Sequence, residues 1–110
     1  MEIKFTARRF RARPELRDHA LATVGRLERF YDGIVTADVI LSYEGSTKSA
    51  KCAEVNLHVY GGLLTAKETS DDYLKSIDAA VGKMTMQLSK YKTKLRMKDK
   101  SKVRAIKDKV

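Results

Sequence analysis

The last forty residues constrain this chain most, because their pattern predicts one long helix with two different sides. At 100° per residue, polar residues gather into a stripe about a third of a turn from an apolar one. The polar stripe comprises Lys83, Gln87, Lys90 and Lys94. Spacings of three and four define the apolar side, formed by Leu74, Ile77, Val81, Met84, Leu88, Tyr91 and Leu95. One side must pack against the protein, and the other must meet solvent or an anion.

Acidic residues are missing from the middle of this helix. Between Asp78 and Asp99 the sequence contains no Asp or Glu, so the repulsion between lysines three or four positions apart is not relieved. Residues 90–110 hold ten Lys or Arg against two Asp, a net charge of +8, whereas residues 1–89 carry only +1. This asymmetry predicts a basic patch for a polyanion, either nucleic acid or an anionic membrane; a solvated, disordered tail is the alternative.

Length and composition restrict the class of protein further. The 110 residues are enough for one domain with a single core. Cys52 is the only cysteine and cannot form an intrachain disulfide, so nothing indicates an oxidising compartment. The sequence shows neither the apolar segment of a signal peptide nor a long uncharged run. We therefore expect a cytoplasmic protein.

Alternating and helical periods along the chain predict the order βαβββα. Strands are expected at residues 2–8, 35–43, about 52–59 and 63–68, and helices at about 14–31 and from about 71 onward. Gly61-Gly62 predicts a tight hairpin in which both turn positions have positive φ. Ser70 is expected to cap the last helix.

The strands have one apolar and one polar side, which predicts how the layers pack. The side chains expected to face inward are Ala37, Val39, Leu41, Tyr43, Ala53, Val55, Leu57 and Val59. Both helices must then cover one face, giving an α+β two-layer βαβββα sandwich with a four-stranded mixed sheet. The first crossover makes strand one parallel to its neighbour. We expect a domain at residues 1–96 and a basic, flexible tail at 97–110.

Catalytic and metal-binding patterns are sparse. His19, His58 and Cys52 are scattered without the spacing of metal ligands, so no metal site is expected. Cys52 or a serine beside His58 could serve a nucleophilic enzyme, yet these residues equally suit a solvated sheet face. Gly61-Gly62 joins two strands and is no phosphate-cradling loop. We expect no enzyme, no cofactor and no small-molecule substrate.

Nucleic acid is the remaining polyanion, because the core itself needs the apolar stripe that a membrane would take. On the open sheet face only Tyr60 offers an outward ring, so base stacking there is not expected. The helical layer should carry the contacts, through the Lys83 to Lys94 stripe, Arg26, Arg29 and the start of the tail. Such a surface grips the phosphate backbone rather than reading bases.

Three segments support a family resemblance: DDYLKSIDAAVGKMTMQLSKYKTKLR at 71–96, LRDHALATVGRLERFYDGI at 16–34, and Gly61-Gly62. In them the chain resembles the ribosome hibernation promoting factor and ribosome-associated inhibitor family, in its short form, over about residues 1–96. The matching positions of the last helix are Asp72, Tyr73, Ile77, Asp78, Lys83, Gln87, Leu88, Lys90, Lys92 and Lys94, and those of the first helix include Arg17, Arg26 and Leu27.

The resemblance implies a non-enzymatic protein that binds the small ribosomal subunit and its rRNA in the mRNA and tRNA channel and inhibits translation under stress or in stationary phase. Met86 stands where many members have Arg, and the tail is basic, unlike the acidic tail of the inhibitor subgroup. A general RNA-binding protein or RNA chaperone is the alternative. Charge pattern and resemblance together give the candidate RNA-binding residues Arg26, Arg29, Lys83, Gln87, Lys90, Lys92, Lys94 and Arg96.

Overall fold

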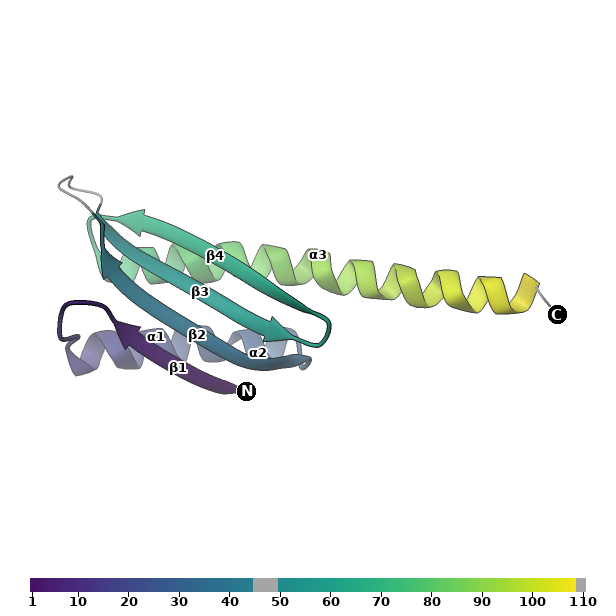
Figure 1. The fold of residues 1–110 in the computed structure, drawn as a ribbon, viewed down its shortest axis with the longest axis horizontal. Helices are drawn as coiled ribbons and strands as arrows, with labels where there is room; N and C mark the ends of the chain where they lie inside the picture. Colours follow the sequence, from purple (N-terminus) through teal and green to yellow (C-terminus); the bar gives the residue numbers. More distant parts are fainter. Residues whose placement is uncertain (45–49, 109–110) are drawn as a thin grey trace.

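A computed structural model describes the backbone of residues 1–44 and 50–108 and the side chains of 1–44 and 50–95. Its elements are β1 (Glu2–Ala7), α1 (Pro14–Gly25), α2 (Leu27–Phe30), β2 (Ile34–Tyr43), β3 (Lys51–Val59), β4 (Gly62–Ser70) and α3 (Tyr73–Asp108). The three helices lie behind the sheet in one layer (Figure 1). The predicted βαβββα sandwich is confirmed. Most of the expected polar loop at 44–51 lies outside the described residues.

The four strands follow one another in the order β1-β2-β3-β4. β1 runs parallel to β2, and the other neighbours are antiparallel, as predicted. Phe5 lies opposite Val39, Val39 opposite Val55, and Val55 opposite Ala66. One apolar row therefore crosses the whole sheet and faces the helices, which is the surface that fixes the register.

α3 packs over β3 and β4, and α1 packs against β1 and α3. Ile77, Met84 and Leu88 of α3 are fully buried. Two side chains predicted to face inward are instead exposed: Leu74 to 42% and Tyr43 to 60%. Both line hollows at the end of the sandwich beside the segment that joins β1 to α1, where neither layer covers them.

The first helix is broken, whereas the sequence predicted one helix to Tyr31. α1 ends at Gly25 and α2 begins at Leu27; glycine costs helix stability because its backbone is the most flexible. The backbone becomes extended at Tyr31, with φ −152°. The Tyr31 ring then lies so close to Gly33 that a Cβ there would come within 2.4 Å of the hydroxyl oxygen. Gly33 thus permits the chain to turn into β2.

The hairpin between β3 and β4 differs from the prediction by one residue. Val59 pairs with Gly62, so Tyr60 and Gly61 form the turn and Gly62 begins β4. Gly61 has φ +83° and is the one glycine with positive φ in the described part of the chain. Only the second turn position therefore needs glycine, and the expected pair of positive φ angles is wrong.

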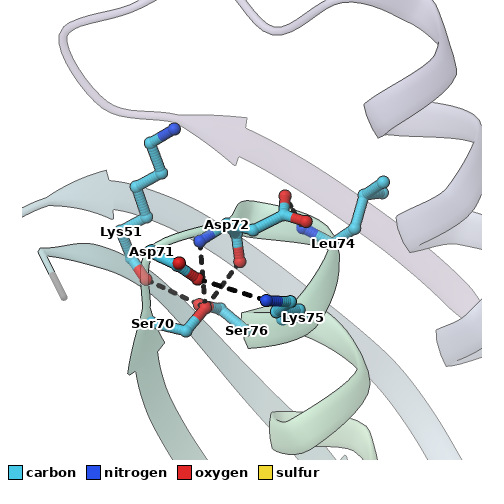
Figure 2. A network of polar contacts seen from close by, with 7 residues as sticks. All are labelled: Lys51, Ser70, Asp71, Asp72, Leu74, Lys75 and Ser76. Carbon is cyan, nitrogen blue, oxygen red and sulfur yellow. Dashed lines mark hydrogen bonds and ion pairs between the residues drawn. The ribbon is translucent and has the colours of Figure 1, made fainter. Parts of the chain in front are cut away.

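The start of α3 is capped by Asp72 rather than by Ser70, as Figure 2 shows. The Asp72 carboxylate accepts a hydrogen bond from the Leu74 amide at 3.1 Å, as an N-cap residue does. Ser70 still belongs to β4, and its hydroxyl accepts from the Asp72 amide at 3.2 Å. It also lies 2.6 Å from the buried Ser76 hydroxyl, which donates to the Lys51 carbonyl at 2.7 Å. This network fixes the start of α3 on β3.

The far end of α3 continues to Asp108 and runs out beyond the β3–β4 hairpin (Figure 1). The sequence predicted fraying from residue 97 because apolar residues become rare there. The described backbone is helical through this segment. The division into a domain at 1–96 and a flexible tail at 97–110 stays a prediction.

Truncating a buried side chain of α3 should destabilise the fold. We expect Leu88→Ala to lower the free energy of unfolding by about 2–5 kcal/mol, because it leaves a cavity between the helix and the sheet. Met86→Ala, on the same helix but 65% exposed, should change it by less than about 0.5 kcal/mol. Urea denaturation followed by circular dichroism measures both, and equal effects would contradict the packing described.

Candidate nucleic-acid interface

One row of polar side chains on α3 runs along β4. Lys83, Lys90 and Lys94 are exposed, and Gln87 is half-buried. The Lys83 ammonium lies 3.6 Å from the Glu68 carboxylate, and the Gln87 side-chain amide donates to the Thr65 carbonyl at 2.8 Å. Because α3 packs over β3 and β4, the side a third of a turn from its buried stripe lies beside this edge strand.

These contacts leave most of the positive charge of the row uncompensated. The pair of Lys83 with Glu68 is half-exposed, and such surface pairs contribute about 0–1 kcal/mol. Lys90 and Lys94 make no ion pair with any residue that the structure describes. A phosphate group could therefore displace the Lys83 contact at small cost and meet the other two lysines directly.

Lys92 lies on the opposite flank of α3 and joins it to α2. Its ammonium donates to the Phe30 carbonyl at 2.9 Å and lies 5.1 Å from the centre of the Phe30 ring. Hydrogen bonding and the cation–π contact together hold this charge near the end of α2. Arg29, in the same helix, is exposed.

A groove of about 490 Å³ separates α1 and α2 from α3. Arg26 and Phe30 line it from one side, and Gly82 and Thr85 line it from α3. The His19 ring and the Asp78 carboxylate, 2.8 Å apart, also belong to its lining. Arg26 is thus brought beside α3, although the two are far apart in sequence.

The other candidate positions complete this surface. Met86, where the family resemblance expected Arg, is 65% exposed on the outer side of α3. Arg96 lies within α3, and its side chain is outside the described residues. The helical layer therefore presents lysine and arginine from both α3 and α2, an arrangement suited to holding a phosphate backbone without reading bases.

Other kinds of site find little support in the described ranges, 1–44 and 50–108. Among the side chains that the structure describes, 1–44 and 50–95, no cluster of three His, Cys, Asp or Glu could hold a metal ion. None of the helices in those ranges is both long and apolar enough to span a membrane. Tyr60 is 77% exposed, as the sequence predicted, but it lies in the β3–β4 turn rather than on the open sheet face.

Cys52 does not suit the nucleophilic role that the sequence left open. Its side chain is buried, with 1% exposure. Burial raises the pKa of the thiol, although a hydrogen bond with Ser42 opposes the shift. The His58 ring lies 3.5 Å from the Asp38 carboxylate. A protonated, enclosed thiol is a poor nucleophile.

Sequence reasoning missed a second basic cluster, in the segment between β1 and α1. Arg8, Arg9, Arg11 and Arg13 are all exposed there. A local count would have found it, since residues 8–13 contain four arginines. The nearly neutral balance of residues 1–89, taken over the whole segment, hid this concentration of charge.

The geometry can now be compared with known proteins. The family model described as "Sigma 54 modulation protein / S30EA ribosomal protein" matches residues 3–96. The chain belongs to this family. The match extends from β1 into α3 and includes all four strands.

Similar known proteins and solved structures agree with this family membership. The ribosome hibernation promoting factor of Klebsiella oxytoca is 33% identical over 96 residues, covering 87% of this chain and 98% of that protein. The ribosome hibernation promotion factor of Bacillus subtilis is 32% identical, covering 77% of this chain but 45% of that longer protein. A ribosomal subunit interface protein from Coxiella burnetii has a TM-score of 0.75 at 29% identity, covering 84% and 99% of the two chains. The Thermus thermophilus Protein Y N-terminal domain has a TM-score of 0.72 at 30% identity, covering 83% and 99%.

The burial of Cys52 predicts slow reaction with thiol reagents. Because its pKa is raised, less thiolate is present at any given pH, so alkylation by iodoacetamide should begin at higher pH in the native protein than in urea. At pH 8 we expect Cys52 in the native protein to react at about one tenth of its rate in urea, or more slowly still. Mass spectrometry of samples taken at successive times measures this alkylation rate. A Cys52→Ala, Ser89→Cys variant, with an exposed thiol, should react equally fast in both states; equal rates for native and unfolded Cys52 would contradict the burial.

Proposed function

We propose that this protein binds the small ribosomal subunit in the channel used by mRNA and tRNA and inhibits translation under stress or in stationary phase. The observation that carries the proposal is the uncompensated charge of α3, where Lys90 and Lys94 have no ion-pair partner among the described residues. Membership of the S30EA family, with relatives named for ribosome hibernation, supports a ribosomal partner.

Binding alone is sufficient for this inhibition. A protein that occupies the channel excludes mRNA and tRNA by volume, so no bond need be made or broken and no catalytic group is required. The requirement is affinity for rRNA, which phosphate contacts by lysine and arginine supply.

The candidate residues differ in the roles that we assign to them. Lys83, Lys90 and Lys94 act as exposed phosphate clamps on α3, and Arg26, which lines the groove, and Arg29 of α2 act from the neighbouring helices. Lys92 donates one ammonium hydrogen to the Phe30 carbonyl and keeps two others for a phosphate. Gln87 has one amide hydrogen engaged with Thr65 and offers the second, together with its oxygen, as a neutral partner.

Reversing the charge of the clamps should abolish binding without unfolding the protein. Lys83→Glu, Lys90→Glu and Lys94→Glu combined place three carboxylates where phosphates should lie, so the protein should no longer sediment with purified small subunits at a salt concentration where the wild type does. Its melting temperature should change little, because exposed substitutions rarely alter stability by more than about 0.5 kcal/mol each.

A matched pair of single variants controls for net charge. Lys90→Glu reverses one exposed charge on α3, and Lys4→Glu reverses one exposed charge on β1, in the other layer. The first should weaken sedimentation with small subunits and the second should not. Equal weakening by both would indicate unspecific attraction and overturn the assigned surface.

A general RNA-binding protein or RNA chaperone is the second candidate, because contacts to a phosphate backbone do not themselves select the ribosome. Competition separates the two. Bound to small subunits, a channel blocker should be displaced by mRNA together with initiator tRNA and retained in the presence of excess duplex RNA. Displacement by duplex RNA at equal nucleotide concentration would favour the general binder. Filtration or sedimentation of the labelled protein measures both.

A further inference from the structure

The end of the sandwich opposite the free part of α3 is a second cationic surface. Two neighbouring cavities open there, of about 470 and 550 Å³. Arg8 and Arg9 line the first, and Arg11 and Arg13 line the second. None of these four arginines forms an ion pair within the part of the chain that the structure describes.

A pair of stacked rings separates the two cavities. Phe10 and Tyr73 lie with their ring centres 4.9 Å apart and their planes 10° from parallel, and both rings line both cavities. The Tyr73 hydroxyl donates to the Ser42 carbonyl at 3.2 Å, which fixes the pair on β2. The wall between the cavities is therefore rigid and aromatic.

Lys51 adds a fifth positive charge, shared by both cavities. Its ammonium lies 5.6 Å from the centre of the Tyr73 ring. Figure 2 shows the side chain extending away from the Ser70–Ser76 network, toward this end of the molecule. The Lys51 ammonium therefore lies at the cavities and takes no part in the polar network below them.

Tyr43 supplies a ring that stacks on no other ring among the described residues. It lines the first cavity together with Arg8 and Arg9, and it is 60% exposed. An exposed tyrosine that shares a cavity with two arginines offers a flat surface for a base and positive charge for the adjoining phosphates. Proteins bind single-stranded nucleic acid in this way.

Three carboxylates lie nearby, and two of them are engaged. Glu44, beside Arg8 and Arg9, pairs with Lys67 at 2.7 Å. Asp72 caps α3 through its bond to the Leu74 amide. Glu15 lies in the first turn of α1. Five cations thus face these three carboxylates, and the site keeps a positive balance.

The backbone at Arg9 is unusual as well. Its φ is +64°, the one positive φ of a non-glycine residue among the described positions. A long side chain is unfavourable in this region, where Asn and Gly are preferred. Arg9 adopts this conformation despite its cost, and residues in such conformations cluster at binding sites.

We propose that this end of the molecule binds an unpaired RNA strand of at least two nucleotides, with a base stacked on Tyr43, its phosphate on Arg8 and Arg9, and the next phosphate across the Phe10–Tyr73 wall on Arg11 and Lys51. The two cavities divided by one wall suit successive nucleotides rather than one. The stacking surface is open only to a base that is not paired. This site is separate from the helical layer and does not rest on the ribosomal channel.

The test is a titration of the full, ¹⁵N-labelled chain with a six-nucleotide single-stranded RNA, without ribosomes. Amide shifts should move at residues 8–13, 43 and 51 in a common saturable curve. The corresponding mononucleotide should bind at least about tenfold more weakly, because it lacks the second phosphate and its base has no neighbour. Equal affinities for the six-nucleotide RNA and the mononucleotide would show that the ligand is a free nucleotide rather than a strand. Amide shifts confined to α3 would overturn the proposed site.

Variants separate stacking from charge. Tyr43→Ala should weaken binding on the order of tenfold, whereas Tyr43→Phe, which keeps the ring, should not. Arg9→Asn should weaken binding while leaving the melting temperature unchanged or higher, since Asn suits the positive φ. Equal affinities of the Ala and Phe variants, or unchanged binding by Arg9→Asn, would contradict the proposal.

A matched double variant controls for total charge. Arg8→Gln with Arg11→Gln removes two cations from the cavities, and Lys4→Gln with Lys75→Gln removes two exposed cations outside them. Only the first double variant should lower the affinity obtained from the amide shifts at residues 8–13. These titrations contain no ribosomes, so a negative result in them leaves the channel proposal intact. Conversely, if the protein fails to sediment with small subunits, the proposal of a single-stranded RNA site still stands.

Discussion

The burial of one side of α3 against β3 and β4 determines the rest of this structure. Ile77, Met84 and Leu88 have no exposed surface. They lie on the side of α3 that packs against the apolar face of β3 and β4. Once that side is fixed, the rotation of the helix is fixed too. The lysines must then lie along β4, along α2 or outward, and the functional surface follows from the packing of the core.

The fold holds some of these charges and leaves others free. Glu68 and the Phe30 carbonyl provide local partners for Lys83 and Lys92, which limits the repulsion along α3. Lys90 and Lys94 have no such partner in the described residues. Charge that the protein does not compensate lowers its own stability and increases its attraction to RNA. This is the physical link between the S30EA sandwich and a ribosomal partner.

The two RNA-binding surfaces that we propose, the helical layer and the end of the sandwich beside Phe10, differ in their chemistry. The helical layer has flexible lysines and a shallow groove, which suit a phosphate backbone. The end beside Phe10 has rigid rings and arginines, which suit an unpaired base. Both depend on contacts between distant segments: Lys92 reaches Phe30 across 62 positions, and Tyr73 reaches Ser42 across 31. Together, the two surfaces that we propose would hold structured and single-stranded RNA at once.

The sequence by itself determined the element order, the layers and the buried side of α3, because periods of two and 3.6 residues report directly which side chains avoid water. It also located the lysine stripe, since charge can be counted without coordinates. Tertiary structure decided the cap at Asp72, the turn at Tyr60 and Gly61, and the exposure of Tyr43 and Leu74. It alone joined Arg26 to α3 and Arg8 to Tyr43. Local patterns record the average surroundings of a residue, whereas these features depend on which particular segments meet at the ends of the layers.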